Sequence, residues 1–165
     1  MNEIKNWLTQ LDQATQEWLE ELGDDVTEAE LTWQAFPNGH SVGAVLTHIA
    51  EVEAYWLHHI ACGELYQDME DEVLHAKINQ DAVQWPTPPP HSLSFYRALL
   101  TTTREKTRAL IGAIESPEHT AKLTWRDGPE QELTLSWLMT HVIVHEAYHG
   151  GQAVLLLLQQ RRKQP

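Results

Sequence analysis

The sequence has a single cysteine, no long hydrophobic run and few basic residues in its first half. Cys62 cannot form a disulfide within the chain, so nothing requires an oxidising compartment. The longest apolar run, residues 153–158, is far shorter than the roughly 20 residues of a membrane-spanning helix. Lys5 and Asp12 interrupt the first stretch, which therefore does not resemble a signal peptide. We expect a cytoplasmic protein that does not enter membranes.

Acidic residues outnumber basic residues, and the excess lies in the first half of the chain. The chain has 24 acidic and 11 basic residues, for a net charge of −13. Residues 1–76 contain 16 acids and only one base, Lys5, whereas residues 77–165 contain 8 acids and 10 bases. Nucleic acids and anionic membrane surfaces select basic faces, so the balance argues against both as partners.

The 165 residues predict one domain, spanning 1–165, that is long enough to bury a substantial core. Apolar residues recur at spacings of three and four in four segments, which predicts helices over residues 4–22, 41–62, 92–114 and 135–161. Ser41 is the predicted cap of the second helix, and Ser92 or Ser94 that of the third. We therefore expect an all-α protein, a four-helix bundle with one long connection.

Two connections have recognisable compositions. Residues 63–91 are acidic at first and proline-rich later, and their length suits a crossover that covers a site. Residues 122–134 include Trp125-Arg126-Asp127-Gly128, which predicts a small hairpin or a turn.

The chain has ten histidines, and three of them have metal-ligand spacing. His141, His145 and His149 follow one another at four-residue intervals, so two neighbouring imidazoles can share one metal ion. His48, on an otherwise apolar face of the second helix, is the best third ligand. Three protein ligands leave coordination positions open for water or substrate, as in catalytic sites. The spacing does not distinguish among Zn, Ni, Fe and Mn.

The remaining histidines and most acids are expected to lie elsewhere. His58, His59, His75, His91 and His119 lie near predicted helix ends or in loops, where exposure to solvent is the default. The acids lie mainly on the first helix, in the loop after it and in the crossover, which we expect to be away from the metal.

Two other metal patterns occur and are less suitable. Residues 145–149 match H-E-x-x-H, the zinc protease motif, but residues 150–165 contain no His, Asp or Glu to supply a third ligand. A di-iron bundle needs two Glu-x-x-His motifs, and residues 72–75 and 146–149 match. Glu72, however, falls in the crossover, and His145 would then have no role.

Residues 39–51 (GHSVGAVLTHIAE) resemble the first metal-binding helix of the DinB/YfiT-like superfamily, and residues 141–152 (HVIVHEAYHGGQ) resemble its last helix. The resemblance implies an up-down-down-up four-helix bundle, a homodimer, and a divalent metal bound by His48, His145 and His149. Gly150 departs from the family, which commonly has Arg after the last ligand.

The resemblance also implies a class of activity. Characterised relatives include S-transferases that use bacillithiol and a maleylpyruvate isomerase that uses mycothiol. A metal lowers the pKa of a bound thiol and so makes thiolate available at neutral pH. We therefore expect a small-molecule substrate and a low-molecular-weight thiol as a candidate cofactor. The leading hypothesis is a metal-dependent enzyme of the thiol S-transferase or hydrolase type.

Four further residues are candidates for the site. Glu146 and His141 are catalytic candidates, although Glu146 lies about 100° round the helix from His145, which weakens it as a base. Gln152 and Tyr55 are candidates for orienting a ligand or cofactor.

Two other functions stay open. The chain could be non-catalytic, either a metal-binding stress-response or sequestration protein or a bundle whose metal is structural. Alternatively, the acidic N-terminal face could bind a partner. Trp7 and Trp18 on the first helix are possible dimer contacts.

Overall fold

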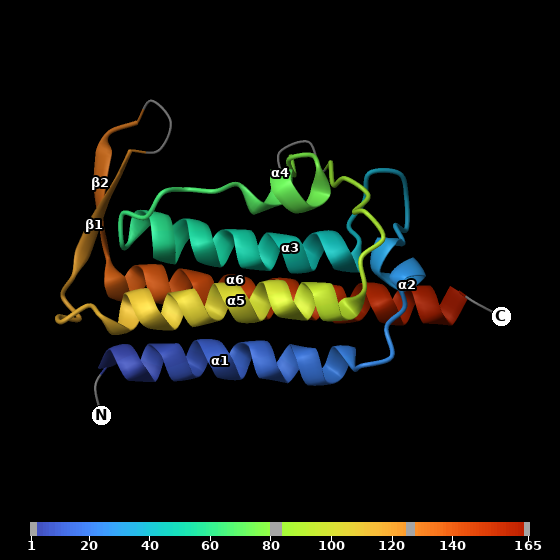
Figure 1. Ribbon diagram of the computed structural model, residues 1–165, viewed down its shortest axis with the longest axis horizontal. Coiled ribbons are helices and arrows are strands. Elements are labelled where there is room, and N and C mark those ends of the chain that lie inside the picture. The colour runs from blue at the N-terminus through green and yellow to red at the C-terminus, as the bar shows by residue number, and fades with distance from the viewer. Residues whose placement is uncertain (1–2, 80–83, 125–127, 164–165) are drawn as a thin grey trace.

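The computed structural model describes residues 3–79, 84–124 and 128–163 and is mainly helical, as predicted. Four long helices lie side by side (Figure 1): α1 (Glu3–Leu22), α3 (Val42–Glu53), α5 (Leu93–Gly112) and α6 (Leu135–Lys163). Helices α3 and α5 run opposite to α1 and α6 in the figure. Within the described ranges, no helix combines the length and the apolar character needed to cross a membrane.

The helix ends largely match their sequence signals. The hydroxyls of Ser41 and Ser92 accept hydrogen bonds from the backbone N–H groups of Ala44 and Phe95, which caps α3 and α5. The second predicted helix changes type part-way, because α3 continues without a break into the π-helical segment η1 (Ala54–Ile60).

Two short helices were not predicted, because each is too short to show apolar periodicity. Helix α2 (Glu28–Thr32) begins with a capping box in which Thr27 and Glu30 bond each other's backbone N–H groups. Helix α4 (Met69–Leu74) lies in the crossover and is capped by Asp68, whose carboxylate accepts a hydrogen bond from the Asp71 N–H.

The predicted hairpin is present and adds a small sheet to the helical fold. Strands β1 (Thr120–Thr124) and β2 (Glu130–Thr134) pair antiparallel, with Thr120 opposite Thr134. Trp125, Arg126 and Asp127 of the predicted turn lie outside the described residues.

The core consists of two hydrophobic clusters separated by a polar layer. One cluster includes Trp18, Leu46 and Leu157, and the other includes Leu11, Leu57 and Leu138. Helices α1, α5 and α6 pass from one cluster to the other, and α3 does so through its continuation η1. Buried polar side chains lie between the clusters along the helices: Thr47, His48, Glu51, Glu53, Thr103, Arg104, Thr107 and Glu146. The interruption of the core places charged and metal-ligating groups inside the helical layer.

Ion pairs join acidic residues of the first half of the chain to basic residues of the second half. Arg97 pairs with Asp24, Arg108 with Asp12, and Arg161 with Glu30 and Asp25. In each pair the acid comes from residues 1–76 and the base from residues 77–165. The acidic first half and the more basic second half therefore neutralise each other in part where they pack.

Candidate metal centre

The structure brings together the three histidines that the sequence selected. His48 on α3 is 2% exposed, and His145 and His149 on α6 are half-buried. One ring nitrogen from each lies within 4.8 Å of the other two, a grouping that could hold a metal ion. The Nε2 atoms of His48 and His145 are 3.2 Å apart. Two nitrogens bound to tetrahedral zinc at 2.0–2.1 Å are separated by about 3.3 Å, so this pair is already spaced as ligands.

Hydrogen bonds at Nδ1 hold the rings of His48 and His149 in place. Glu70 Oε1 lies 2.7 Å from His48 Nδ1, and Gln152 Oε1 lies 2.7 Å from His149 Nδ1. A carboxylate and an amide oxygen accept, so each Nδ1 donates and the neutral ring keeps a lone pair on Nε2. Metal-ligating histidines have this arrangement in many proteins. The residues present therefore fit a divalent cation. Gln152, a candidate for orienting a ligand or cofactor, contacts His149 in the structure.

The crossover lies over this centre and supplies contacts that the sequence did not predict. The Glu51 carboxylate of α3 accepts from the backbone N–H of Met69 at 2.7 Å and from the hydroxyl of Tyr66. Glu70 Oε2 accepts from the Ile78 N–H at 3.1 Å. For Glu70, the expectation that the crossover acids lie away from the predicted metal site is therefore wrong. Their clustering was visible in the sequence, but the path of the loop was not.

Trp85 covers the centre from the far end of the crossover. Its ring, 3% exposed, lies 5.3 Å from that of His48, 6.4 Å from that of His149 and 4.2 Å from that of His40, measured between centroids. Burial and the nearby His48 lower the pKa of His40. On this side the centre is walled by aromatic side chains, which lowers the local dielectric around the ligands.

The opposite flank of the centre is open. His145 lines a surface hollow of about 410 Å³ together with five other α6 residues: Trp137, Thr140, His141, Val144 and Tyr148. His141 stacks on Trp137 with ring centroids 5.0 Å apart, and its ring centroid lies 6.2 Å from that of His145. His141 is thus beside the centre and faces the same hollow.

Comparison with known proteins agrees with this geometry. A model of the DinB superfamily matches residues 3–153. The chain belongs to the DinB superfamily. Searches of curated proteins and of solved structures found no significant match. The DinB match includes both helices that carry the histidines, as well as the crossover between α3 and α5.

Two of the four additional candidates lie away from the three histidines of this DinB chain. Glu146 is 1% exposed and faces the polar layer, where it accepts hydrogen bonds from Arg104 at 2.7 Å and from Thr15. Tyr55 packs its ring against Tyr66, Trp56 and His59. These contacts are those of a buried ion pair and of an aromatic cluster.

His58 corrects the expectation for the other histidines. It is 5% exposed, and its Nε2 lies 2.8 Å from Thr107 Oγ1. Burial lowers the pKa of His58. Of the remaining four, His75 is exposed, whereas His59, His91 and His119 are half-buried. The π-helical turn carries His58 inward, and no periodic pattern in the sequence revealed this.

Gly150, where the DinB family commonly has Arg, packs against α1. A Cβ atom at this position would lie 2.2 Å from the Trp18 indole. No side chain fits there unless Trp18 moves, so the indole and the glycine are a matched pair. Trp18 is 4% exposed and Trp7 is 9% exposed, so both serve the core rather than a dimer contact.

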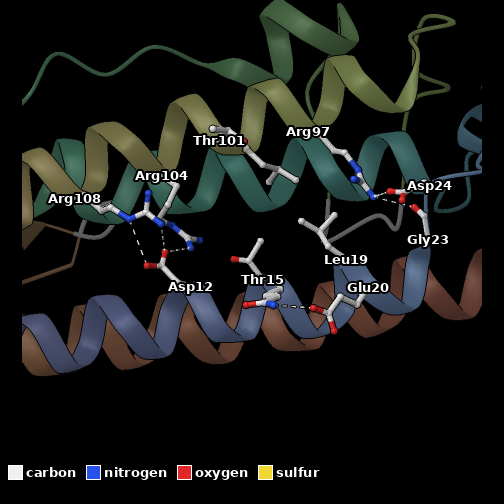
Figure 2. A pocket seen from close by; sticks show the side chains of 12 residues that line it. Asp12, Thr15, Leu19, Glu20, Gly23, Asp24, Arg97, Thr101, Arg104 and Arg108 are labelled. Carbon is white, nitrogen blue, oxygen red and sulfur yellow. Dashed lines mark hydrogen bonds and ion pairs between the residues drawn. The ribbon is translucent and has the colours of Figure 1, made fainter.

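A second hollow, of about 690 Å³, lies between α1 and α5 (Figure 2). Arg97, Arg104 and Arg108 reach into it from α5, but each already has an acidic partner: Asp24 for Arg97, and Asp12 for the other two. With these three arginines paired within the chain, the hollow offers no unpaired arginine among its lining residues to attract an anion.

Replacing Glu70 with Gln is expected to weaken divalent-metal binding about 10–100-fold, the usual effect of losing an outer partner of a ligating histidine. The amide keeps the size of the side chain but holds His48 Nδ1–H less strongly than a carboxylate. Isothermal titration with Zn²⁺ measures the effect. Glu72→Gln is the matched control, because Glu72 is exposed on the same short helix. Equal affinities for the two variants would contradict the role of Glu70.

The metal-free protein is expected to lose stability as the pH falls below 6.5. Burial, then the neighbouring His149 and His48, lower the pKa of His145 to about 2. Burial and His48 lower the pKa of His149 to about 4, against the opposing effect of the hydrogen bond that His149 donates to Gln152. In the unfolded chain both imidazoles bind protons below about pH 6.5, whereas in the folded chain they bind protons only at lower pH. Protonation below about pH 6.5 therefore favours unfolding. Above about pH 6.5 both states are unprotonated, and the folded protein has its full stability with respect to these two groups.

Thermal unfolding of chelator-treated protein between pH 7.5 and pH 4 tests this expectation. The melting temperature of the wild type should decline more steeply below pH 6.5 than that of His149→Gln, which lacks one of the two groups. Parallel curves for the two proteins would contradict it.

Proposed function

We propose that the protein is a metal-dependent enzyme of the thiol S-transferase or hydrolase type, acting on a small molecule. One observation carries the proposal: three imidazoles from α3 and α6 share one centre, and His145 also borders an open hollow. A divalent ion held there would lower the pKa of a thiol or a water molecule that it coordinates. Membership of the DinB superfamily supports the proposal, since the resemblance implies a divalent metal at these positions.

The residues around the centre suit distinct tasks. Glu70 and Gln152 fix the orientation of His48 and His149 through their Nδ1 atoms. Trp85 excludes water on the crossover side. His141 is the group that can give or take a proton in the hollow; burial lowers its pKa, so the ring is neutral and able to accept a proton at pH 7. We assign Glu146 to the Arg104 ion pair rather than to proton transfer.

A fluorogenic conjugation assay tests the transferase activity. Each low-molecular-weight thiol is supplied together with monochlorobimane. The thiol sulfur bonds to the carbon that carries the chlorine, chloride leaves, and the thiol proton passes to solvent. We expect turnover with the metal-loaded wild type, loss of activity in His149→Ala, and an altered pH profile in His141→Gln. Hydrolysis of p-nitrophenyl acetate tests the second reaction type in the same variants.

A metal-loaded protein without either activity would favour the non-catalytic alternative, a metal-binding stress-response bundle. Metal binding at the three histidines would stand in that case, whereas the enzyme assignment would not.

We also propose the family's up-down-down-up bundle for the four long helices, a homodimeric state and a cytoplasmic location. The helix directions in Figure 1 support the topology. The lone Cys62, which has no cysteine in the chain to pair with, suits a reducing compartment.

A further inference from the structure

The outward face of α6 is apolar and exposed. Five large side chains on it are 45–63% exposed: Trp137, Val144, Tyr148, Leu155 and Leu158. Between Leu135 and Gln160 the helix has a single Asp, Glu, Lys or Arg residue, Glu146, and that one is buried. In a chain with a net charge of −13, a helix face without charge over this length is unusual, and contiguous exposed apolar surface of this kind marks interaction sites.

The exposed residues form a stripe with the period of a helix–helix seam. From Trp137 to Arg162 the stripe advances by alternating steps of four and three residues, through His141, Val144, Tyr148, Gly151, Leu155 and Leu158. This 3.5-residue repeat is the pattern by which two helices pack along a shared seam. The buried residues of α6, such as Leu138, Val142 and Ala153, lie on the opposite face, against α1 and α3. The stripe (residues 137–162 in this repeat) therefore has the pattern of a second seam.

We propose that the stripe is the interface with a second copy of this chain, packed α6 against α6 in antiparallel orientation. The proposal names the surface of the homodimer proposed above and rests on that state. Charge favours this occupant. Two chains of charge −13 repel each other except where their charges are absent, and the stripe is such a face. A basic partner would select the acidic α1 instead.

The chemistry along the stripe selects the antiparallel register. With the two stripes fully overlapped, Trp137 faces the partner's Arg162, which suits a cation–π contact. Val144 faces the partner's Leu155, and Tyr148 faces the partner's Gly151. A Cβ atom at Gly151 would meet nothing within 4 Å, so the helix surface there has room for a ring. A parallel pair would instead bring the basic ends, residues 161–163, of the two helices together.

The same register closes the hollow beside His145. Val144 and His141 border the hollow, and they face the partner's Leu155 and the partner's Leu158. The second chain would thus roof the open flank of the metal centre and form the outer wall of the substrate space. Dimer formation and the shape of the active site are coupled in this arrangement.

Sedimentation equilibrium of Leu155→Glu tests the surface. We expect the wild type to have twice the 18.9 kDa mass of the chain, and Leu155→Glu to dissociate at least about 100-fold more readily, because each dimer would bury two unpaired carboxylates. Leu65→Glu is the control, since Leu65 is 88% exposed in the crossover, outside the stripe. Unchanged helicity by circular dichroism shows that both variants fold.

The outcomes separate this inference from the homodimer proposal. A monomeric wild type would overturn both. A wild-type dimer that Leu155→Glu leaves intact would overturn the α6 surface alone and leave the homodimer standing.

Disulfide trapping tests the register in a Cys62→Ser background. Val144→Cys combined with Leu155→Cys should give a covalent dimer on oxidation, whereas Leu155→Cys alone should not. The two positions are 11 residues apart on one helix, about 16 Å, too far for a disulfide within a chain. Trapping of Leu155→Cys alone as efficiently as the double variant would overturn the antiparallel arrangement.

Discussion

His48→Ala is expected to lower the affinity for a divalent ion by more than about 100-fold while leaving most of the helical structure in place. The loss should exceed the 10–100-fold effect of removing an outer partner, because a ligand itself is removed. The helix should persist because ten other residues of α3 are buried in it and Ser41 caps its start. Titration with Zn²⁺ and far-UV circular dichroism measure the two effects on the same sample.

His119→Ala is the control for this experiment. The His119 ring donates a hydrogen bond from Nε2 to the Ala61 carbonyl oxygen, at 2.8 Å. Among the described contacts, none joins His119 to a residue of the proposed centre. Its replacement should leave metal affinity unchanged. If His48→Ala unfolded outright, the metal would be holding the fold, and the structural, non-catalytic interpretation would replace the enzymatic one.

Arg104→Met is expected to destabilise the protein by about 3–5 kcal/mol, the effect of breaking a buried ion pair on one side. Arg104 donates two hydrogen bonds to Glu53, at 2.8 and 2.9 Å, and one to Glu146 at 2.7 Å. Both glutamates are 1% exposed, so the substitution leaves two carboxylates in the core without their cation. Burial lowers the pKa of Arg104, but Glu53 and Glu146 outweigh it and raise that pKa, so the guanidinium stays charged.

Urea denaturation of Arg104→Met and of Arg108→Met measures this difference. Arg108 also pairs with Asp12, but its side chain is 51% exposed, so its loss should change the free energy of unfolding by less than about 1 kcal/mol. Replacing Glu53 and Glu146 with Gln in the Arg104→Met protein should restore part of the stability. Equal effects of the two arginine substitutions would contradict the account of the polar layer.

The sequence predicted the long helices and the three clustered histidines because both depend on helical periodicity. A helix that buries one face must repeat its apolar residues every three or four positions, and the same spacing puts His145 and His149 on one side. His48 could be selected because it interrupts an apolar face. The DinB resemblance and the geometry then agreed on the same three residues.

The rest of the site depends on contacts between distant segments, which periodicity does not record. Glu70 reaches His48 only because Glu51 and the backbone of the crossover fix that loop over α3. Trp85 lies over the centre for the same reason. Local capping did leave a signal, since Thr27 and Glu30 have capping-box spacing, but five residues are too few to show an apolar stripe.

Elemental analysis of the wild-type protein, purified without added metal, tests the central claim most directly. The account predicts about one divalent ion per chain, held by His48, His145 and His149 and absent from His48→Ala. A wild-type protein without metal at a stoichiometric level, and without uptake on titration, would contradict it.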